Sequence, residues 1–296
     1  MSAPRVSIII PTYNHARFLG RALQAVLDQT MSEWEAVVID NFSTDYTMQV
    51  MQNHTDPRIR HVLFANHGVI AASRNHGISL TTAPYVAFLD SDDWWQADKL
   101  ALSVAKLEQG ADLSCHAETW VGPGPRRREV SYGPRERSTY DSLLFEGNCI
   151  STSAVVVRRK CLLDAGCFST EAAFNTAEDY DLWLKLARNG ASMEFLPEVL
   201  GEYLLHDANN SRSHLRNMNA VMAVFEHHLQ GLGKEAQDES RVTRRRGLIY
   251  YGGARTLHQA GLFSQASEYY WKALRHYPGR VQTWAGMLLN TLRLSV

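Results

Sequence analysis

The sequence predicts an α/β fold in which a doubly wound, mostly parallel sheet precedes an all-α C-terminal region. Unbroken apolar runs of strand length lack the alternation of half-exposed strands, which is typical of strands buried on both faces of a parallel sheet. Amphipathic segments of helical period separate these runs. From about residue 215 onward the sequence has the pattern of helices only.

Predicted strands and helices alternate at short spacing along the first half of the chain. Sheets built in this way bind ligands beyond the carboxyl ends of their strands. We expect one α/β domain over residues 1–214 and a helical region over residues 215–296. The expected strands are Val6–Ile10, Ala36–Ile39, Ile59–Phe64 and Tyr85–Leu89, and the expected helices are Ala16–Gln29, Val69–Leu80, Ala97–Gln109 and Tyr180–Ala187.

Composition excludes several classes of protein. The 296 residues are 45% hydrophobic and 21% charged, which is typical of a globular protein and excludes a disordered chain. Lys and Arg number 30 and Asp and Glu 31, so no overall charge attracts nucleic acid, and we expect no nucleic-acid partner. The four cysteines form no CxxC pair, so no structural zinc site is expected. Without a signal peptide or a run of about 18 apolar residues, the protein is expected to be cytoplasmic.

The helical region contains a pattern similar to a tetratricopeptide-like hairpin over about residues 247–279. Small residues at Ala254, Ala266 and Ala273 would let two helices approach closely. A single hairpin cannot bury its own faces, so we expect it to pack on the α/β domain, on the segment that follows or on another copy of the chain in a homo-oligomer. The pattern consists of Tyr250, Ala254, Leu257, Gly261, Ala266, Tyr270, Ala273 and Pro278.

Two further segments each have two interpretations. Residues 281–294 are amphipathic and carry Trp284 and Leu288. One interpretation is an internal helix that caps the hairpin. The other is an exposed surface that contacts a partner or, peripherally, the inner face of a membrane. The Arg-rich residues 122–137 form either a solvated hairpin or a contact for a phosphate-bearing acceptor or an anionic membrane.

Polar side chains follow three of the predicted strands at the points where those strands end. Asp90 and Asp92, spaced i, i+2, converge on one point, and hard oxygen ligands of this kind suit Mg²⁺ or Mn²⁺ bridged to a diphosphate. The alternative is that Asp92 and Asp93 precede a helix, whose N-terminus favours anions. Trp94 and Trp95, directly after them, are expected in the core, with a sugar-binding face as the alternative.

Five segments carry most of the information about function. They are Pro11–Asn14, Val38–Asp45, Ala72–Gly77, Phe88–Asp93 and Ala177–Trp183. In this order and spacing they resemble the inverting glycosyltransferases of family 2, which have the GT-A fold. The resemblance covers residues 5–212. It implies metal-dependent transfer of a sugar from a nucleotide-diphosphate donor to an acceptor hydroxyl. The implied setting is bacterial surface polysaccharide assembly (lipopolysaccharide, capsule or exopolysaccharide), with a saccharide or a lipid-linked saccharide as acceptor.

The resemblance also implies a donor site at the strand ends. Pro11, Thr12 and Tyr13 match the segment that packs on the nucleotide base. Asp40 and Asn41 match the pair of residues that reads the base. Asp45 matches the acidic residue that closes the loop after this pair. Arg74 and Asn75 match the helix start that faces the diphosphate or sugar; Asp90 and Ser91 match contacts to ribose or sugar, with Asp90 and Asp92 as metal ligands.

The pair Asp40-Asn41 departs from the two carboxylates of many uridine-reading members. A carboxylate only accepts hydrogen bonds, whereas an amide donates and accepts, so dTDP and GDP join UDP as candidate donor nucleotides.

The candidate catalytic base lies on a separate element. Transfer needs a general base for the acceptor hydroxyl and a metal or cation for the leaving diphosphate. By resemblance Asp179 matches the base, with Glu178 as the alternative base and His206 as a further metal ligand or diphosphate contact. The structural alternatives are that Glu178 and Asp179 cap a helix and that His206 is a hydrogen-bonded structural residue.

The sequence also admits two other functions. A sugar-1-phosphate nucleotidyltransferase would use a similar sheet, but it needs a Gly-rich basic loop that residues 11–20 lack. A non-catalytic scaffold would use the helical region, and the intact acidic motifs argue against it. The sequence contains no GxGxxG, GxxxxGK[ST] or GxSxG motif, so dinucleotide, P-loop and α/β-hydrolase chemistry lack support.

Overall fold

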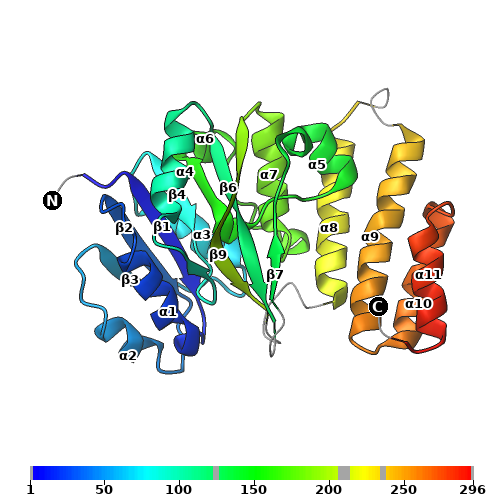
Figure 1. Ribbon diagram of the computed structural model, residues 1–296, viewed down its shortest axis with the longest axis horizontal. Coiled ribbons are helices and arrows are strands. Elements are labelled where there is room, and N and C mark those ends of the chain that lie inside the picture. Colours follow the sequence, from blue (N-terminus) through cyan, green and yellow to red (C-terminus); the bar gives the residue numbers. More distant parts are fainter. Residues whose placement is uncertain (1–2, 123–126, 206–213, 234–237, 295–296) are drawn as a thin grey trace. The chain divides into compact units, whose positions relative to one another are not determined.

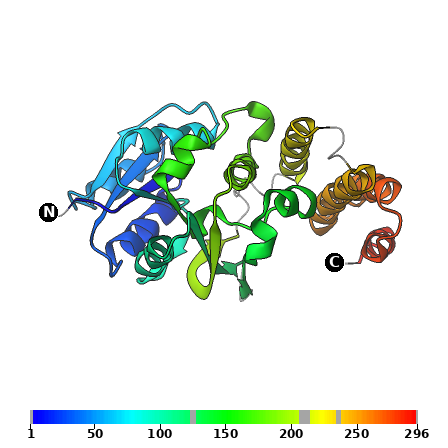
Figure 2. The same ribbon diagram turned by 90° about the horizontal axis from the view of Figure 1, so that it is seen from above.

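The computed structural model describes residues 3–122, 127–205, 214–233 and 238–294. The chain forms two compact units. The sheet unit comprises Met1–Leu143, Asn148–Thr170 and Asp181–His206, and the helical unit comprises Leu144–Gly147, Glu171–Tyr180 and Asp207–Val296. Figures 1 and 2 show the strands and helices of each unit in two views.

Among its described residues, the sheet unit contains a nine-stranded sheet of order β3-β2-β1-β4-β8-β6-β9-β5, with β7 paired to β6. Strands β1 to β4 pair in parallel, whereas β8 is antiparallel to both β4 and β6. The predicted α/β fold class is confirmed, with most of its parallel pairing in the first four strands. The strands are β1 (Val6–Thr12), β2 (Trp34–Asp40), β3 (Ile59–Leu63), β4 (Tyr85–Phe88), β5 (Trp94–Trp95), β6 (Leu113–Val121), β7 (Arg127–Val130), β8 (Val155–Arg158) and β9 (Met193–Leu204).

Helices follow the first strands at the predicted places. The three helices predicted in the first half correspond to α1 (Ala16–Leu27), α3 (Ile70–Ser79) and α4 (Lys99–Glu108). The apolar pattern does not predict the short helix α2 (Thr47–Gln52), because six residues are too few to show a period. Further along the chain come the helices α5 (Tyr140–Glu146), α6 (Arg159–Asp164) and α7 (Glu178–Arg188), and the 3₁₀ turns η1 (Arg135–Ser138), η2 (Thr152–Ala154) and η3 (Ala172–Phe174).

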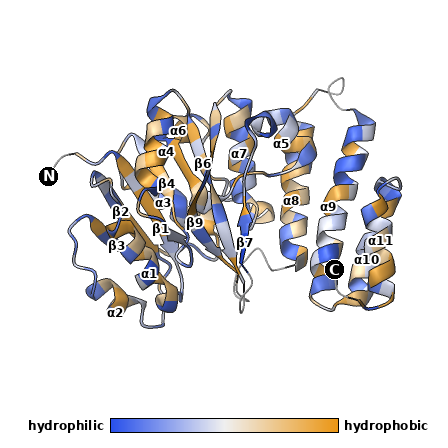
Figure 3. Cartoon of the chain, viewed as in Figure 1, coloured by the Kyte–Doolittle hydropathy of each residue, from blue (hydrophilic) through white to orange (hydrophobic). Residues whose placement is uncertain are grey.

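Strand β1 is buried along its whole length because helices cover both faces of the sheet. Val6, Ile8 and Ile10 pack with α1 and α4 in one apolar cluster. Ile9 instead faces Gly77 of α3. Alternate side chains of a strand point to opposite faces, so both sets must be apolar here. This explains the unbroken apolar run of β1 in the sequence. Figure 3 colours the residues of β1 by hydropathy.

The Arg-rich segment forms an arm of the sheet. Strand β7 pairs antiparallel with the end of β6, so the expectation of a hairpin is confirmed for the described residues. Arg127 lies 3.2 Å from Glu202 and Arg135 lies 2.7 Å from Glu194, with both arginine side chains mostly exposed. Exposed pairs of this kind contribute little to stability. Residues 123–126 lie outside the described residues.

The helical unit contains the helices α8 (His214–Gln230), α9 (Glu239–Gln259), α10 (Phe263–His276) and α11 (Val281–Thr291). Helices α9 and α10 form a hairpin whose turn includes Gly261 at φ +75°. Ala254, Ala266 and Ala273 are buried, as expected for a close approach of two helices. None of the helices in the described ranges is both long and apolar enough to cross a membrane.

Helix α11 packs on the hairpin through a face that the apolar pattern does not predict. Its buried residues are Thr283, Gly286 and Asn290. Trp284 and Leu288 are 49% and 61% exposed. The helix therefore covers part of the hairpin as a cap. Met287 packs partly buried against the hairpin and Trp284 meets Trp271 of α10 edge-to-face, but Trp284 and Leu288 stay about half exposed or more.

Replacing Gly77 by alanine tests the packing of α3 on the sheet. A methyl group there would lie 2.6 Å from Cγ2 of Ile9. We expect Gly77→Ala to lower the free energy of unfolding by about 1–3 kcal/mol, because overpacking forces side chains and backbone to shift. Urea unfolding followed by circular dichroism measures the change.

Gly20→Ala is the matched control for this variant. Gly20 also lies inside a helix, but a methyl group there would meet Val50 at an ordinary 3.7 Å. The control should be as stable as the parent or more stable by up to about 1 kcal/mol. Equal losses of stability in the two variants would contradict the close approach of α3.

Candidate functional site

The carboxyl ends of β1, β2 and β4 share one edge of the sheet. Thr12 is in register with Asp40, and the amide of Asn41 continues the pairing by donating to the carbonyl oxygen of Thr12 over 3.0 Å. On the other side of β1, the amide of Leu89 donates to the carbonyl oxygen of Ile9 over 3.1 Å. The polar segments expected after these strands therefore lie at the same edge.

Asp40 is buried at this edge, and its carboxylate organises the loop after β2. One oxygen accepts hydrogen bonds from the amide and hydroxyl of Ser43 at 2.8 and 2.7 Å, and the other lies 3.1 Å from Nε2 of His61. Burial by itself raises the pKa of Asp40, but the hydrogen bonds from His61 and Ser43 outweigh it and hold the pKa below its ordinary value. The ionised carboxylate therefore fixes the loop.

A second set of hydrogen bonds joins the loops after β1 and β2. The side-chain oxygen of Asn14 accepts from the amide of Thr44 at 2.7 Å. Asp45 accepts from the amide of Ala16 at 3.0 Å and from the amide and hydroxyl of Thr47 at 3.0 and 2.6 Å. The first amides of a helix have no partner within the helix, so Asp45 supplies one to both α1 and α2.

Aromatic rings stay exposed beside these loops. Tyr13 and Phe42 are each 53% exposed. Asn41, next to Phe42 in the chain, is held by the amide of Asn66, which donates to its side-chain oxygen over 2.9 Å. Exposed aromatic faces can stack on any nucleobase, and the polar atoms beside them can contact its edge.

The acidic segment after β4 forms a tight turn. The amide of Asp93 donates to the carbonyl oxygen of Asp90 over 3.0 Å. Strand β5 follows at once and α4 begins only later, so the alternative that Asp92 and Asp93 start a helix is wrong. The physical reason is that β5 pairs with β9 and draws the chain into the sheet. Arg74, buried in α3, donates to a carboxylate oxygen of Asp90 at 2.8 Å.

The hydroxyl of Ser153, in η2, holds this turn from inside. It accepts from the amide of Asp90 at 3.1 Å and donates to a carboxylate oxygen of Asp93 at 2.6 Å. The other oxygen of Asp93 accepts from the amide of Leu204, the last residue of β9, at 3.1 Å. Ser153 and Asp93 thus tie the end of β4 to the start of β8 and the end of β9.

Asp93 and Glu118 form a buried acidic group that the motifs did not identify. Burial raises the pKa of Asp93 well above its ordinary value, and the charges of Asp92, Glu118 and Asp90 raise it further. Burial also raises the pKa of Glu118 to about 7, although a hydrogen bond from Tyr132 opposes the shift. The sequence carries only a weak signal for Glu118, because β6 (LSCHAETWV) contains other polar residues and Glu118 is merely its one carboxylate.

Two other polar contacts support the turn and the helix that faces it. Nδ1 of His15, just before α1, lies 3.0 Å from the hydroxyl of the buried Ser91. Asn75 donates to the carbonyl oxygen of Phe168 at 2.8 Å and accepts from its amide at 3.0 Å. Arg74 therefore faces the acidic turn, whereas the amide of Asn75 is held by backbone of another loop.

The two tryptophans after the acidic turn differ in burial. Trp95 is buried, its indole N–H donates to the carbonyl oxygen of Ser153 at 2.7 Å, and the ammonium of Lys99 lies 3.7 Å from its ring centre. The expectation of a core residue is confirmed for Trp95. Trp94 is partly exposed, with the guanidinium of Arg21 at 5.3 Å from its ring centre.

The described residues contain no group of three or more His, Cys, Asp or Glu side chains placed to hold a metal ion. Asp90 and Asp92 nevertheless fit a cation that takes one or two carboxylates from the protein and its remaining oxygens from a substrate phosphate and water, as Mg²⁺ does. His206, the further candidate ligand, lies outside the described residues.

The candidate base segment belongs to the helical unit. A carboxylate oxygen of Glu178, the first residue of α7, accepts from the amide of Thr176 at 2.8 Å, and one of Asp179 accepts from the amide of Tyr180 at 2.7 Å. Asp179 therefore accepts an amide of the first turn of α7, as the capping alternative expects, whereas Glu178 contacts an amide that precedes the helix. These contacts leave room for a chemical role, because each carboxylate has about four lone-pair positions.

Residues from α8 and α9 anchor this segment. Asn217 donates to the carbonyl oxygen of Thr176 at 2.9 Å. Arg245 donates to the hydroxyl of Tyr180 at 3.3 Å and is 7% exposed. The helical unit therefore determines the local conformation of the candidate base.

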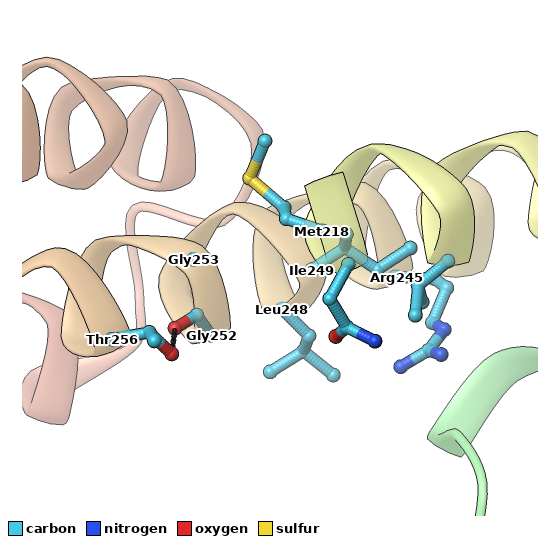
Figure 4. A pocket seen from close by; sticks show the side chains of 9 residues that line it. Met218, Arg245, Leu248, Ile249, Gly252, Gly253 and Thr256 are labelled. Carbon is cyan, nitrogen blue, oxygen red and sulfur yellow. Dashed lines mark hydrogen bonds between the residues drawn. The ribbon is translucent and has the colours of Figure 1, made fainter. Parts of the chain in front are cut away.

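A pocket of about 160 Å³ lies between α8 and α9 (Figure 4). The anchoring residues Asn217 and Arg245 line it, and Gly252 and Gly253 leave space on the α9 side. All of its lining residues are described, and none is a carboxylate or a histidine. The pocket therefore holds none of the candidate catalytic groups.

Comparison with known proteins identifies the family. The model of Glycosyl transferase family 2 matches residues 7–164. The chain belongs to glycosyl transferase family 2. It is 33% identical over 218 residues to TuaG of Bacillus subtilis (strain 168), a protein named for teichuronic acid biosynthesis, with 71% of this chain and 82% of TuaG covered. The prediction of a glycosyltransferase is thereby confirmed.

Two further likenesses bear on this family-2 glycosyltransferase. It is 29% identical over 221 residues to WfgD of Escherichia coli, a UDP-Glc:alpha-D-GlcNAc-diphosphoundecaprenol beta-1,3-glucosyltransferase, with 74% of this chain and 85% of WfgD covered. The solved structure of the mannosyltransferase PcManGT from Pyrobaculum calidifontis, in complex with GDP-Man and Mn²⁺, has a TM-score of 0.63 at 20% identity and covers 99% of this chain and 81% of that one. At this identity the structural likeness shows the shared fold.

Glu118→Gln tests the buried acidic group of the family-2 glycosyltransferase. Folding raises the pKa of Glu118 from its ordinary 4.5 to about 7, so the folded state binds the proton more tightly and stability falls as pH rises between these values. We expect this group to lower the free energy of unfolding by about 1–3 kcal/mol between about pH 5 and pH 8. Glu118→Gln should remove the contribution of Glu118 to this loss of stability. Urea unfolding of the parent and the variant at about pH 5 and pH 8 measures it.

Glu198→Gln, on the exposed side of β9, is the matched control and should keep the parent's pH dependence. Asp93 titrates in the same direction, so a residual slope is expected in Glu118→Gln. If the free energy of unfolding falls with pH as steeply in Glu118→Gln as in the parent, Glu118 is ionised in the folded protein at neutral pH.

Proposed function

We propose that this protein transfers a sugar from a nucleotide-diphosphate donor to an acceptor hydroxyl, with inversion at the anomeric carbon and with a divalent metal ion. The acidic turn Asp90–Asp93 carries the proposal, because Arg74 and Ser153 hold it at the sheet edge where β1 and β2 also end. Open α/β sheets bind their ligands at this edge.

The donor site is built from the loops at this edge. Tyr13 and Phe42 supply aromatic faces for the base, and Asn41, beside the Asp40 loop, reads its polar edge. UDP is the preferred nucleotide, supported by the UDP-Glc donor in the name of WfgD. GDP, bound by PcManGT, and dTDP are the alternatives.

The metal is assigned to Asp92 together with Asp90, and either Mn²⁺ or Mg²⁺ suits these oxygen ligands. When bound, the ion supplies charge neutralisation to the diphosphate as it leaves. PcManGT, solved with Mn²⁺, supports this assignment. Arg74 adds a fixed positive charge behind Asp90 and holds its carboxylate in place through a hydrogen bond of 2.8 Å.

Asp179 is the proposed base. It takes the proton from the acceptor hydroxyl, whose oxygen forms a bond to the anomeric carbon while the bond from that carbon to the diphosphate oxygen breaks. The products are the new glycoside and the nucleoside diphosphate. Asn75, held by Phe168, acts as a positioning residue for the neighbouring Arg74.

The product class is proposed from the relatives. TuaG is named for teichuronic acid biosynthesis, and the acceptor named for WfgD is a sugar carried on diphosphoundecaprenol. We therefore assign this protein to bacterial surface polysaccharide assembly, with a saccharide on a lipid carrier as the acceptor.

Thermal shift with nucleotides and metals tests the donor site. UDP, GDP and dTDP are each added with Mn²⁺, with Mg²⁺ or with a chelator, and a ligand of the folded state raises the melting temperature. We expect a metal-dependent rise with one nucleotide. In Asp92→Asn the affinity for that nucleotide in the presence of metal should fall at least about tenfold.

Asp28→Asn, at the exposed end of α1, is the matched control for Asp92→Asn and should bind as the parent does. If no nucleotide changes the melting temperature with either metal, the proposed donor site is ruled out.

Asp179→Asn separates binding from chemistry. The variant should keep the metal-dependent thermal shift and release nucleoside diphosphate from the sugar nucleotide about 10²–10⁴-fold more slowly, because only the proton acceptor is lost. Glu178→Gln is the companion variant. Parent-like turnover in Asp179→Asn together with loss in Glu178→Gln would transfer the role of base to Glu178.

A further inference from the structure

Helix α11 buries a small and polar stripe, with Met287 partly buried beside it, and leaves most of its large apolar side chains exposed. Thr283, Gly286 and Asn290 are its buried residues. A Cβ on Gly286 would lie 2.8 Å from the hydroxyl of Tyr270, so the two helices approach closely there. Asn290 donates to the carbonyl oxygen of Phe263 at 2.9 Å. A surface helix ordinarily buries its apolar stripe, so the reversed arrangement requires another explanation.

The exposed side of α11 is a continuous apolar stripe. Val281, Trp284, Leu288 and Leu292 are 75%, 49%, 61% and 58% exposed and follow the spacing i, i+3, i+7, i+11, which places them on one side of the helix. Trp271 of α10 is 50% exposed and packs edge-to-face on Trp284, with ring centres 6.3 Å apart. These five residues form the α10–α11 apolar face.

Basic residues outnumber acidic ones beside this face. Glu268, one helical turn before Trp271, is exposed and pairs with Lys272 at 2.6 Å. The chain has a net charge of −1, but its residues 269–296 contain no Asp or Glu. Arg275 is exposed one helical turn after Trp271, and Arg293 is exposed next to Leu292. The Lys and Arg residues of this segment are Lys272, Arg275, Arg280 and Arg293.

We propose that the α10–α11 apolar face docks on a lipid surface that carries anionic phosphate headgroups. Tryptophan and leucine on one side of a helix, combined with arginine and lysine, are the composition of helices that lie in the membrane interface. Indole rings favour the headgroup level. The apolar side chains enter the boundary of the acyl chains, and the arginines contact lipid phosphates. This inference goes beyond the transfer reaction and does not depend on it.

A second copy of the chain suits this face less well. Two copies packed face to face would bring the exposed Arg275 and Arg293 of both copies together, and the nearby Glu268 is already paired with Lys272. An anionic surface removes this repulsion and adds an attraction of about 1 kcal/mol for each basic residue near it.

Vesicle flotation with the full-length protein tests the proposal. Vesicles of phosphatidylglycerol mixed with phosphatidylcholine are compared with vesicles of phosphatidylcholine alone. We expect flotation with the anionic vesicles, a shift of tryptophan emission to shorter wavelength, and weaker binding at high salt. In Leu288→Ser/Leu292→Ser, which keeps both exposed tryptophans, partitioning should fall at least about tenfold.

Two further variants separate the apolar and the charged contributions. Leu102→Ser/Leu163→Ser removes two leucines of the sheet unit that are 38% and 53% exposed, and it should float as the parent does. Arg275→Gln/Arg293→Gln should bind anionic vesicles about tenfold less tightly. Circular dichroism and the urea midpoint of each variant establish that it is folded.

Absence of flotation with anionic vesicles, or equal losses in the two leucine double variants, would overturn the proposal. Light scattering after size exclusion detects the competing outcome. A dimer that Leu288→Ser/Leu292→Ser disrupts, without flotation of the parent, would assign the face to a second copy. The nucleotide thermal shift is recorded in parallel, so failure of lipid binding and failure of the donor site are distinguished.

Discussion

The hydroxyl of Ser153 connects the chain segments on which the acidic turn depends. It accepts a hydrogen bond from the amide of Asp90 and donates one to a carboxylate oxygen of Asp93. The other carboxylate oxygen of Asp93 accepts a hydrogen bond from the amide of Leu204, at the end of β9. A buried carboxyl group is tolerated only where its oxygens have hydrogen-bond partners. The turn after β4, the start of β8 and the end of β9 are therefore positioned together, and Asp92 owes its place at the sheet edge to this buried contact.

Residues at the sheet edge divide into those that hold the loops and those that face outward. The carboxylates of Asp40 and Asp45 accept hydrogen bonds from the loops that follow β1 and β2. Tyr13 and Phe42 present exposed rings on these same loops. A donor nucleotide would thus meet aromatic faces whose supporting loops are already ordered, which lowers the entropy lost on binding.

The helical unit takes part in the proposed chemistry because the candidate base segment folds with it. Asn217 and Arg245 hold backbone and side-chain atoms on either side of Asp179. A change in α8 or α9 can therefore alter the reaction through the orientation of Asp179. The same unit carries the α10–α11 apolar face, so a lipid contact and the support of the base would reside in one compact set of helices.

The sequence by itself determined β1, β2 and β4, because burial on both faces leaves an unbroken apolar run in each of them. It also indicated the family through its motifs, and parallel pairing brings the segments after these three strands to one edge. Only the tertiary structure decided the roles of Ser153 and Glu118, because hydrogen bonds between segments distant in the chain have no period in the sequence. It also decided which side of α11 faces outward. An amphipathic pattern does not specify which face finds a partner, and here the close approach of Tyr270 favours glycine at position 286 on the inner side.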